Sequence, residues 1–444
     1  MKIDSTIFKA YDIRGIYGDN LTDDLIKSIG NNFASQMDEQ TIIIGRDMRL
    51  SSENIFNALA EGIKKTGKNV IDIDLVSTDT TYFASGFLGH PSIMITASHN
   101  PSEWNGFKMT FANAKPFGQE EIQDLKTKIE NDEYIETGND GQIESIDAIP
   151  DYIKKALNFI RTKNFKPLKI VVDAGNGMAG KIVPLFFSSL PCKIIPLYFE
   201  LDGAFPNHQP NPIESKNLID LQKTVLKEKA DFGMAFDGDA DRVFFINEKA
   251  QIIKGDIIVS VLAEYFLKNN PKEKIIYDLR CSHDVPETIK KNNGQPIISK
   301  VGHSFIKKLM RETSAIFGGE LSGHYYYRDN YMVDSGIITA LIMTEIISLS
   351  NKKLSDLLVS YSNYYNIEET NFKVNDKEKK LNQLKEKYKD GQQNELDGLT
   401  VEYKNWWFNV RPSNTEPFLR LNLEAKTKKL MEEKKEEIIK LITS

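Results

Sequence analysis

Short apolar runs that end in a glycine- or aspartate-rich turn recur along this chain, and they constrain its fold more than any other feature. Residues 41–44 lead into Gly45-Arg46-Asp47, and residues 92–96 lead into Ser98. Continuous apolar runs of this length are typical of strands that are buried on both faces. The same pattern recurs at residues 70–73, 169–173, 232–236 and 274–278, and residues 53–65 form a helix-like segment before the run at 70–73. Strands that alternate with helices predict an α/β fold, in which ligands bind just beyond the carboxyl ends of the strands.

The first polar loop follows the expected strand 92–96. Residues 96–101 read Thr-Ala-Ser-His-Asn-Pro, so the Ser98 hydroxyl has a potential proton carrier, His99, beside it. An ordinary turn would use the same residue types, because Ser, Asn and Pro favour turns. Lys108 follows in the next tight turn, close enough along the chain to serve the same pocket. We therefore interpret Ser98 as a reactive serine.

The second polar loop follows the expected strand 232–236. Residues 237–242 read Asp-Gly-Asp-Ala-Asp-Arg, and the small residues let Asp237, Asp239 and Asp241 converge on one ion. A calcium loop of the EF-hand type would need glycine where Arg242 stands, whereas Mg²⁺ accepts few carboxylates when phosphate completes its shell. A hydroxyl nucleophile beside such a loop predicts phosphoryl transfer.

A glycine-rich segment carries the strongest competing signal. Residues 173–180 match the dinucleotide fingerprint after a strand, and Glu200 lies about 20 residues beyond the last glycine. That pattern would predict a nicotinamide-dependent oxidoreductase. It would leave Ser98 and the Asp loop without a role, so we favour a tight strand-to-helix turn.

Two further loops offer groups for a phosphorylated sugar. Residues 318–324 place Glu320, Ser322 and His324 on a glycine-rich loop, where a carboxylate can accept from neighbouring sugar hydroxyls. Residues 411–417 combine Arg411 with small polar side chains, which predicts a phosphate cradle. A second arginine beside glycine, Arg14, lies near the N-terminus.

Composition narrows the classes of partner and compartment. The formal net charge is −6 and the pI is about 5.7, which gives no basic footprint for nucleic acid. Cys192 and Cys281 lack metal or disulfide spacing. No signal peptide or apolar run of about 20 residues is present, so we expect a cytoplasmic protein that is not associated with a membrane.

Five motifs in order give the chain a resemblance to the α-D-phosphohexomutase family, and within it to the phosphomannomutase/phosphoglucomutase branch. They are residues 8–15, 96–101, 237–242, 319–324 and 411–417, and the match covers almost the whole chain.

The resemblance implies four domains around a central cleft. Three are related α/β domains with mixed sheets, and the fourth is a C-terminal helix-on-sheet (α+β) domain. We expect an N-terminal domain with the phosphoserine loop at 1–150 and a metal-loop domain at 151–250. A sugar-loop domain at 251–367 and a phosphate-binding domain at 368–444 would follow. The resemblance assigns residues 173–180 to the second domain, which argues against the dinucleotide interpretation.

The same resemblance implies roles for the site residues. Ser98 would be the phosphoserine, and it would hold Mg²⁺ together with Asp237, Asp239 and Asp241. Groups expected to handle protons or stabilise charge are His99, Lys108, Arg14 and His324. Groups expected to contact substrate are Tyr11, Arg242, Arg280, His303, Glu320, Ser322, Arg411, Ser413, Asn414 and Thr415.

The predicted function is a phosphohexomutase that interconverts hexose 1-phosphates and hexose 6-phosphates of mannose, glucose or both. It would act through a phosphoserine enzyme and a hexose 1,6-bisphosphate, which is also the expected activator. Its partners would be small hexose phosphates, and the chain would be a monomer or a homodimer. A phosphoglucosamine mutase and a Mg²⁺-dependent sugar phosphatase remain alternatives. Leu321, between Glu320 and Ser322, resembles the hexose branch more than the glucosamine branch.

Overall fold

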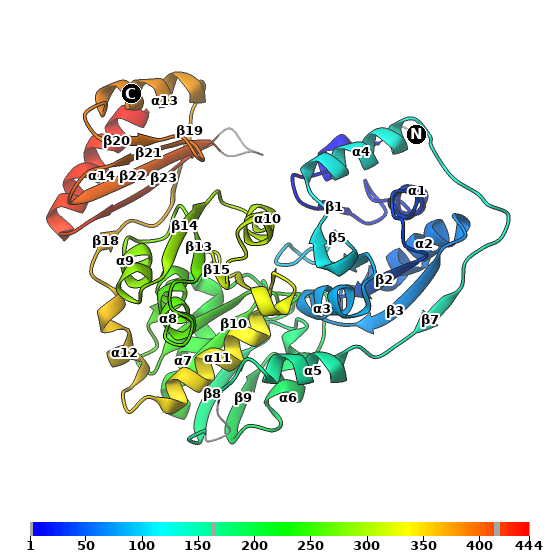
Figure 1. Cartoon of the computed structure of the whole chain (residues 1–444), viewed down its shortest axis with the longest axis horizontal. Coiled ribbons are helices and arrows are strands. Elements are labelled where there is room, and N and C mark those ends of the chain that lie inside the picture. The colour runs from blue at the N-terminus through cyan, green and yellow to red at the C-terminus, as the bar shows by residue number, and fades with distance from the viewer. Residues whose placement is uncertain (1–2, 162–164, 413–417, 444) are drawn as a thin grey trace.

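Four β-sheets with flanking helices make up the computed structural model, which describes residues 3–161, 165–412 and 418–443. We number the domains I to IV in chain order by these sheets. Figure 1 shows domain I in blue and cyan, domains II and III side by side in green and yellow, and domain IV in orange and red. In the described part of the chain, no helix is long and apolar enough to cross a membrane. The predicted α/β class, with a helix-on-sheet fourth domain, is confirmed.

Domain I contains a mixed sheet in the order β1-β5-β4-β2-β3-β7, with β6 paired to β5. Strands β2, β3, β4 and β7 are parallel, and β5 is antiparallel to both β4 and β1. Its strands are β1 (Ile13–Ile16), β2 (Thr41–Arg46), β3 (Asn69–Leu75), β4 (Ser92–Ile95), β5 (Trp104–Phe111), β6 (Lys115–Pro116) and β7 (Ile143–Ser145). Its helices are α1 (Asp23–Ser35), α2 (Ser52–Lys65), α3 (Thr78–Leu88) and α4 (Gln119–Glu130).

Domain II repeats this mixture of parallel and antiparallel strands in the order β12-β11-β10-β8-β9. Its strands are β8 (Leu168–Asp173), β9 (Cys192–Leu197), β10 (Phe232–Phe236), β11 (Val243–Asn247) and β12 (Ile252–Ile253). Its helices are α5 (Ile149–Leu157), α6 (Ala179–Phe187) and α7 (Ile219–Glu228).

Domain III has a third mixed sheet in the order β14-β13-β15-β16-β17. Its strands are β13 (Lys274–Asp278), β14 (Gln295–Ser299), β15 (Phe317–Gly319), β16 (Tyr325–Tyr327) and β17 (Val333–Asp334). Its helices are α8 (Gly255–Leu267), α9 (Asp284–Lys291), α10 (His303–Thr313), α11 (Gly336–Leu349) and α12 (Leu354–Leu357).

Domain IV differs, because its sheet β18-β23-β22-β21-β20, with β19 paired to β23, is wholly antiparallel. Its strands are β18 (Tyr365–Asn366), β19 (Thr370–Lys373), β20 (Gln392–Asn394), β21 (Leu399–Glu402), β22 (Trp406–Pro412) and β23 (Phe418–Ala425). Its helices are α13 (Lys377–Lys387) and α14 (Lys428–Thr443).

The three mixed sheets place their functional loops at equivalent positions. In each sheet a strand that runs parallel to one neighbour turns back into an antiparallel partner. The closing residue pairs are Ile95 with Phe107, Phe236 with Val243, and Gly319 with Tyr325. The loops inside these pairs carry Ser98, the three aspartates and Glu320. One strand-to-strand turn, used three times, therefore presents all three motifs beyond the carboxyl ends of the parallel strands.

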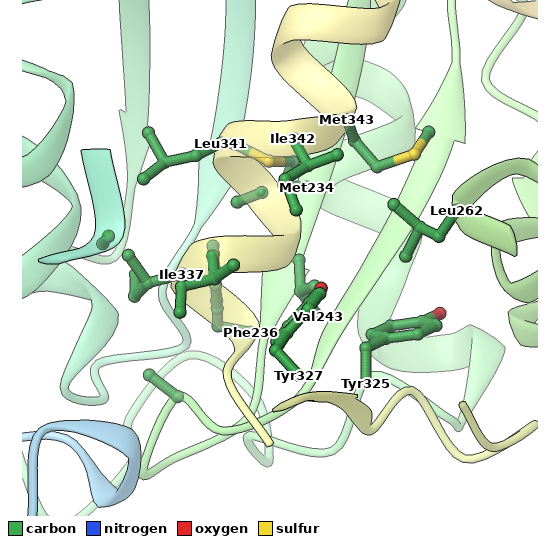
Figure 2. Close-up of a cluster of buried hydrophobic side chains, with 14 of the residues drawn as sticks. Met234, Phe236, Val243, Leu262, Tyr325, Tyr327, Ile337, Leu341, Ile342 and Met343 are labelled. Carbon is green, nitrogen blue, oxygen red and sulfur yellow. The ribbon is translucent and has the colours of Figure 1, made fainter. Parts of the chain in front are cut away.

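One core extends through domains II and III and includes one side of domain I, whereas the other side of domain I and the whole of domain IV have separate clusters. The shared core runs from Phe83 in α3 through Tyr152 in α5 to helix α11, most of whose side chains are buried. Figure 2 shows the α11 side chains Ile337, Leu341 and Ile342 near strands β10 and β11 and the tyrosines of β16. A separate cluster fills domain IV, between its sheet and helices α13 and α14.

Two local expectations differ from the structure. Lys108, expected in a tight turn, lies within strand β5 and pairs there with Met94. Residues 138–141 suggest a linker by composition, yet the chain returns to the sheet of domain I directly afterwards. Strand β7 pairs there with β3, through Val70 and Ile143. Strand β7 lies at the sheet edge and its side chains are exposed, so its sequence lacks the apolar run that marks a central strand.

Candidate active site

The side chain of Ser98 contacts both the Asp loop and Arg242. Its Oγ donates a hydrogen bond to Asp237 Oδ2 at 2.7 Å and accepts one from Arg242 Nη2 at 2.8 Å. Ser98 is buried and has a backbone φ of 53°, a left-handed conformation that is uncommon for a serine. Such backbone strain persists only where surrounding contacts impose it, and it is frequent at functional sites.

Glycines let the two loops approach each other closely. A Cβ atom on Gly238 would lie 2.5 Å from the Ser98 carbonyl oxygen, and one on Gly177 would lie 2.6 Å from the Gly238 oxygen. The amide of Met178 also donates to the Gly238 oxygen at 2.9 Å. The glycine-rich segment 173–180 therefore supports the Asp loop, which accounts for the spacing that resembles a dinucleotide fingerprint.

The three aspartates form a group that fits a metal ion. Asp237, Asp239 and Asp241 are buried, and each offers a carboxylate oxygen within 4.8 Å of the other two. The Oδ1 atoms of Asp239 and Asp241 are buried and have no hydrogen-bond partner in the described structure. Unpartnered carboxylate oxygens are costly in a protein interior, and a hard divalent cation would satisfy them.

Lys108 neutralises part of this charge. Its Nζ lies 2.7 Å from Asp239 Oδ2 and 2.5 Å from Asp241 Oδ2. Burial opposes the charge on Lys108, but the two carboxylates outweigh burial and raise its pKa well above the usual value. Burial would likewise raise the pKa of Asp239, but Lys108 and the Thr78 hydroxyl shift that pKa downward. Lys108 is therefore a fixed positive charge at this site.

Two histidines beside this group are held neutral. The Nδ1 of His99 lies 3.2 Å from Ser98 Oγ and contacts the Arg242 guanidinium. His324 Nε2 lies 3.7 Å from Asp241 Oδ1, and its Nδ1 lies 3.0 Å from Ser322 Oγ. Burial and then the Arg242 charge lower the pKa of both histidines well below its usual value. Both rings are therefore neutral at neutral pH, and each has one ring nitrogen that can accept a hydrogen bond.

Domain III adds the sugar-loop residues next to this cluster. Glu320 accepts hydrogen bonds from the Gly302 amide at 3.1 Å and from the Tyr326 hydroxyl at 2.5 Å. The ring of His303 lies 6.2 Å from that of His324 and 5.4 Å from that of Tyr11 in domain I. Burial raises the pKa of Glu320, since this carboxyl group has little water around it.

The predicted arginines have different partners. Arg14 donates to the Ala97 carbonyl at 3.1 Å and to Asn100 Oδ1 at 2.6 Å, so it contacts the serine loop directly. Arg280 pairs with Asp278 at 2.9 Å, beside the sugar loop. Arg411 lies on β22 of domain IV, where its partner is Glu369 at 3.0 Å. Three predicted phosphate ligands of that loop lie outside the described residues: Ser413, Asn414 and Thr415.

Two residues that contact these loops lie outside the sequence motifs. Thr78 donates from Oγ1 to Asp239 Oδ2 at 2.5 Å and from its amide to the Asp239 carbonyl at 3.0 Å. Arg49 is buried under the Ser98 loop and donates to several of its carbonyl groups. For Arg49, the sequence does give an indication, because the residue follows the charged turn Gly45-Arg46-Asp47 at the end of strand β2. Thr78 has no comparable signal, since it begins an ordinary helix.

Comparison with known proteins gives a consistent result along the whole chain. Descriptions of the alpha/beta/alpha domains I, II and III of phosphoglucomutase/phosphomannomutase match residues 5–136, 150–251 and 254–364. The C-terminal domain of the same family matches residues 369–441.

Individual relatives agree with this result. The chain is 39% identical to a phosphomannomutase of Vibrio cholerae over 98% of both chains. It is 38% identical to a phosphomannomutase of Escherichia coli K12 over 95% of both. The crystal structure of a phosphoglucomutase/phosphomannomutase family protein from Burkholderia thailandensis superposes with a TM-score of 0.92 at 33% identity, covering 99% of this chain and 97% of that one.

Fold, site and relatives together define an isomerase that moves a phosphate group within a sugar phosphate. The chain belongs to the phosphoglucomutase/phosphomannomutase branch of the α-D-phosphohexomutase family.

Proposed function

We propose that Ser98 carries the phosphoryl group, and that the enzyme interconverts hexose 1-phosphates and 6-phosphates of mannose, glucose or both. Phosphorylated Ser98 transfers its phosphoryl group to the free hydroxyl of the bound hexose phosphate, which forms a hexose 1,6-bisphosphate. The bisphosphate turns over in the site and returns its other phosphate to Ser98. The observation that carries this proposal is the convergence of Ser98 Oγ with Asp237 and Arg242.

Mg²⁺ is the proposed resident ion, held by Asp237, Asp239 and Asp241 together with an oxygen of phosphorylated Ser98. When bound, Mg²⁺ would neutralise part of the negative charge on the phosphoryl group. Arg242, whose Nη2 already contacts Ser98 Oγ, supplies a second positive charge at the same atom. Lys108 and Arg14 add further fixed positive charge around the serine loop.

His324 is the proposed proton acceptor for the attacking sugar hydroxyl. Its ring is neutral, and it lies between Asp241 and Ser322. Lys108 is a poorer candidate, because its two carboxylate partners keep it protonated. His99 is neutral too, but its Nδ1 already contacts the Arg242 guanidinium. Proton transfer from the hydroxyl to His324 therefore suits the geometry best.

The remaining residues are proposed to bind the sugar phosphate in both orientations. Glu320 and Ser322 hold sugar hydroxyls, and Tyr11, His303 and Arg280 line the same region. Arg411, with Ser413, Asn414 and Thr415, binds the phosphate that is distant from Ser98. This division requires Arg411 to exchange its Glu369 partner for a phosphate. A phosphate can accept the same charge-assisted contacts from this guanidinium that the carboxylate accepts.

A coupled assay tests the proposal. Purified enzyme with Mg²⁺ and a trace of glucose 1,6-bisphosphate is given mannose 1-phosphate, glucose 1-phosphate or glucosamine 1-phosphate. We expect conversion of mannose or glucose 1-phosphate to the 6-phosphate. We also expect the Ser98→Ala variant to lose most of that activity while it keeps the Tm of the wild type.

The other outcomes separate the alternatives. Preferred conversion of glucosamine 1-phosphate would indicate a phosphoglucosamine mutase. Release of inorganic phosphate without any 6-phosphate product would indicate a phosphatase. Full activity of Ser98→Ala would contradict the phosphoserine mechanism.

A further inference from the structure

The Arg49 side chain is wholly buried, and its guanidinium group bonds to the backbone of the serine loop. Nη1 donates to the carbonyl oxygens of Pro101 at 2.6 Å and Trp104 at 2.8 Å. Nη2 donates to those of Ser98 at 2.9 Å and Asn100 at 2.7 Å. One side chain therefore fixes four peptide groups between residues 98 and 104, and the first of them belongs to the proposed phosphoryl carrier.

Arg49 itself is held from two sides. Its Nε lies 3.3 Å from Asp47 Oδ2, and Asp47 Oδ1 accepts from the Arg49 amide at 3.1 Å and from Ser52 Oγ at 2.9 Å. From domain II, the ring of Phe205 lies 5.1 Å from the guanidinium carbon. The backbone at Gly203 comes so close that a Cβ there would lie 2.7 Å from the Arg49 Cα.

Position matters at this loop because Ser98 has a left-handed backbone that is not favourable by itself. Local hydrogen bonds in the loop are few: the Ser98 amide donates to Thr96 Oγ1, the Asn100 amide to Ala97 and the Trp104 amide to Pro101. Arg49 gives this turn four hydrogen bonds, whereas Arg14 gives it two, so Arg49 is the main side chain that holds its backbone in the described structure.

We propose that Arg49 is a positioning residue for phosphoryl transfer, which holds the Ser98 loop in register with the Asp loop. The inference rests on the proposed role of Ser98 as phosphoryl carrier. A planar guanidinium can reach four carbonyl oxygens at once, whereas a lysine ammonium has three donors on a single atom. Lysine at this position would keep the positive charge but could not donate hydrogen bonds to all four carbonyl oxygens.

Arg46 offers a matched control on the same turn. It is also largely buried, and its guanidinium also has several partners: Asp72 at 2.6 Å, Glu53 at 2.9 Å and Asp74 at 3.0 Å. None of these partners belongs to the serine loop. Arg46→Lys therefore measures the general cost of shortening a buried arginine here.

The experiment compares wild type, Arg49→Lys and Arg46→Lys in three measurements. They are kcat and KM for glucose 1-phosphate, the rate at which glucose 1,6-bisphosphate phosphorylates Ser98 (followed by intact-protein mass), and Tm. We expect Arg49→Lys to lower kcat and the phosphorylation rate about 100-fold, because a displacement of about 1 Å at a reacting group costs that much. KM should stay close to wild type, and Arg46→Lys should leave all kinetic values near wild type.

A second variant tests the same inference if Arg49→Lys does not fold. Asp47→Asn keeps the size of the side chain but removes the charge that orients Arg49, and we expect kcat to fall about 10-fold at unchanged KM. A folded Arg49→Lys with the kinetics of Arg46→Lys would overturn this inference alone. If Arg49→Lys does not fold, an unaltered kcat in Asp47→Asn would do the same. A wild type that never carries phosphate on Ser98 would overturn the proposed function and this inference with it.

Discussion

At the residue scale, the charge balance of the Asp loop depends on one lysine. Lys108 binds Asp239 and Asp241, while the Oδ1 atoms of both aspartates have no hydrogen-bond partner in the described structure. Three carboxylates so close together repel one another in a medium of low dielectric constant. Without a metal, Lys108 and Arg242 are the cations that make this cluster tolerable.

Replacement of Lys108 by methionine should therefore make the protein depend on metal. Loss of one partner of a buried ion pair costs about 3–5 kcal/mol, so we expect a lower Tm in EDTA than for wild type. Mg²⁺ should then raise the Tm of Lys108→Met by more than that of wild type, because no ammonium competes for the carboxylates. Thermal melting with EDTA and with Mg²⁺ measures both effects.

Lys307→Met provides the matched control. Lys307 is also buried and pairs with Asp334 at 2.7 Å, outside the Asp loop. It should lose a similar amount of stability with a smaller gain in the Mg²⁺-dependent rise of Tm, because Lys307 affects Asp241 only through its charge whereas Lys108 binds two of the three aspartates. Equal rises of Tm in wild type and Lys108→Met would contradict a competition between Lys108 and the metal, and no rise in either protein would contradict the assignment of these aspartates as metal ligands.

At the scale of elements, one buried carboxylate joins helices from three domains. Asp79 in α3 accepts from the hydroxyls of Tyr152 in α5 at 3.0 Å and of Ser335, just before α11, at 2.7 Å. Burial raises the pKa of Asp79 to about 6 from its ordinary 3.8. The proton therefore binds more tightly to the folded than to the unfolded protein.

Stability should consequently fall as pH rises through this range. Below pH 3.8 Asp79 is protonated in both states, and above pH 6 it is ionised in both. Between these values the raised pKa costs the folded state a total of about 3 kcal/mol. Asp79→Asn lacks this penalty, so its Tm relative to wild type should increase from pH 4.5 to 6.5. Melting curves across that range check it, and a Tm difference independent of pH would refute it.

At the scale of the whole molecule, the distribution of cores indicates which part can move. One side of domain I joins the core of domains II and III, and the Asp79 junction connects all three domains, so they are expected to behave as one body although domain I also has a cluster of its own. Domain IV has a separate core and carries Arg411. We expect it to close over a bound sugar phosphate, which shields the phosphoenzyme from water.

Arg411→Ala tests this closure. Loss of a charge-assisted contact to the distal phosphate should raise KM about 10- to 100-fold. In small-angle X-ray scattering, glucose 1,6-bisphosphate should reduce the radius of gyration of wild type but not of the variant. The Mg²⁺-dependent rise of Tm should stay unchanged, because Arg411 lies outside the Asp loop. Kinetics equal to those of wild type would contradict a role for Arg411 in phosphate binding.

The sequence predicts much of the local structure and of the site chemistry. Apolar runs locate β2, β4, β8, β10 and β13, because a buried central strand has to be apolar on both faces. The same rule misses the exposed edge strand β7. The spacing of the aspartates indicates a cation site, and the structure brings their oxygens together. The resemblance of five ordered motifs supplies the four-domain architecture, which periodicity alone leaves open.

Some features were decided only by tertiary structure. Ser98 and Asp237 are 139 positions apart, and only the equivalent turns of two sheets bring them within 2.7 Å. In the sequence, Arg49 is one charged loop residue among many, and only the folded structure shows that its guanidinium donates to the carbonyl groups of the serine loop. The amino-acid order alone specifies which chemical groups this protein has and where its strands turn, because both depend on residues that are neighbours along the chain. Which groups meet, and which domain has a core of its own, depends on packing between residues far apart along the chain.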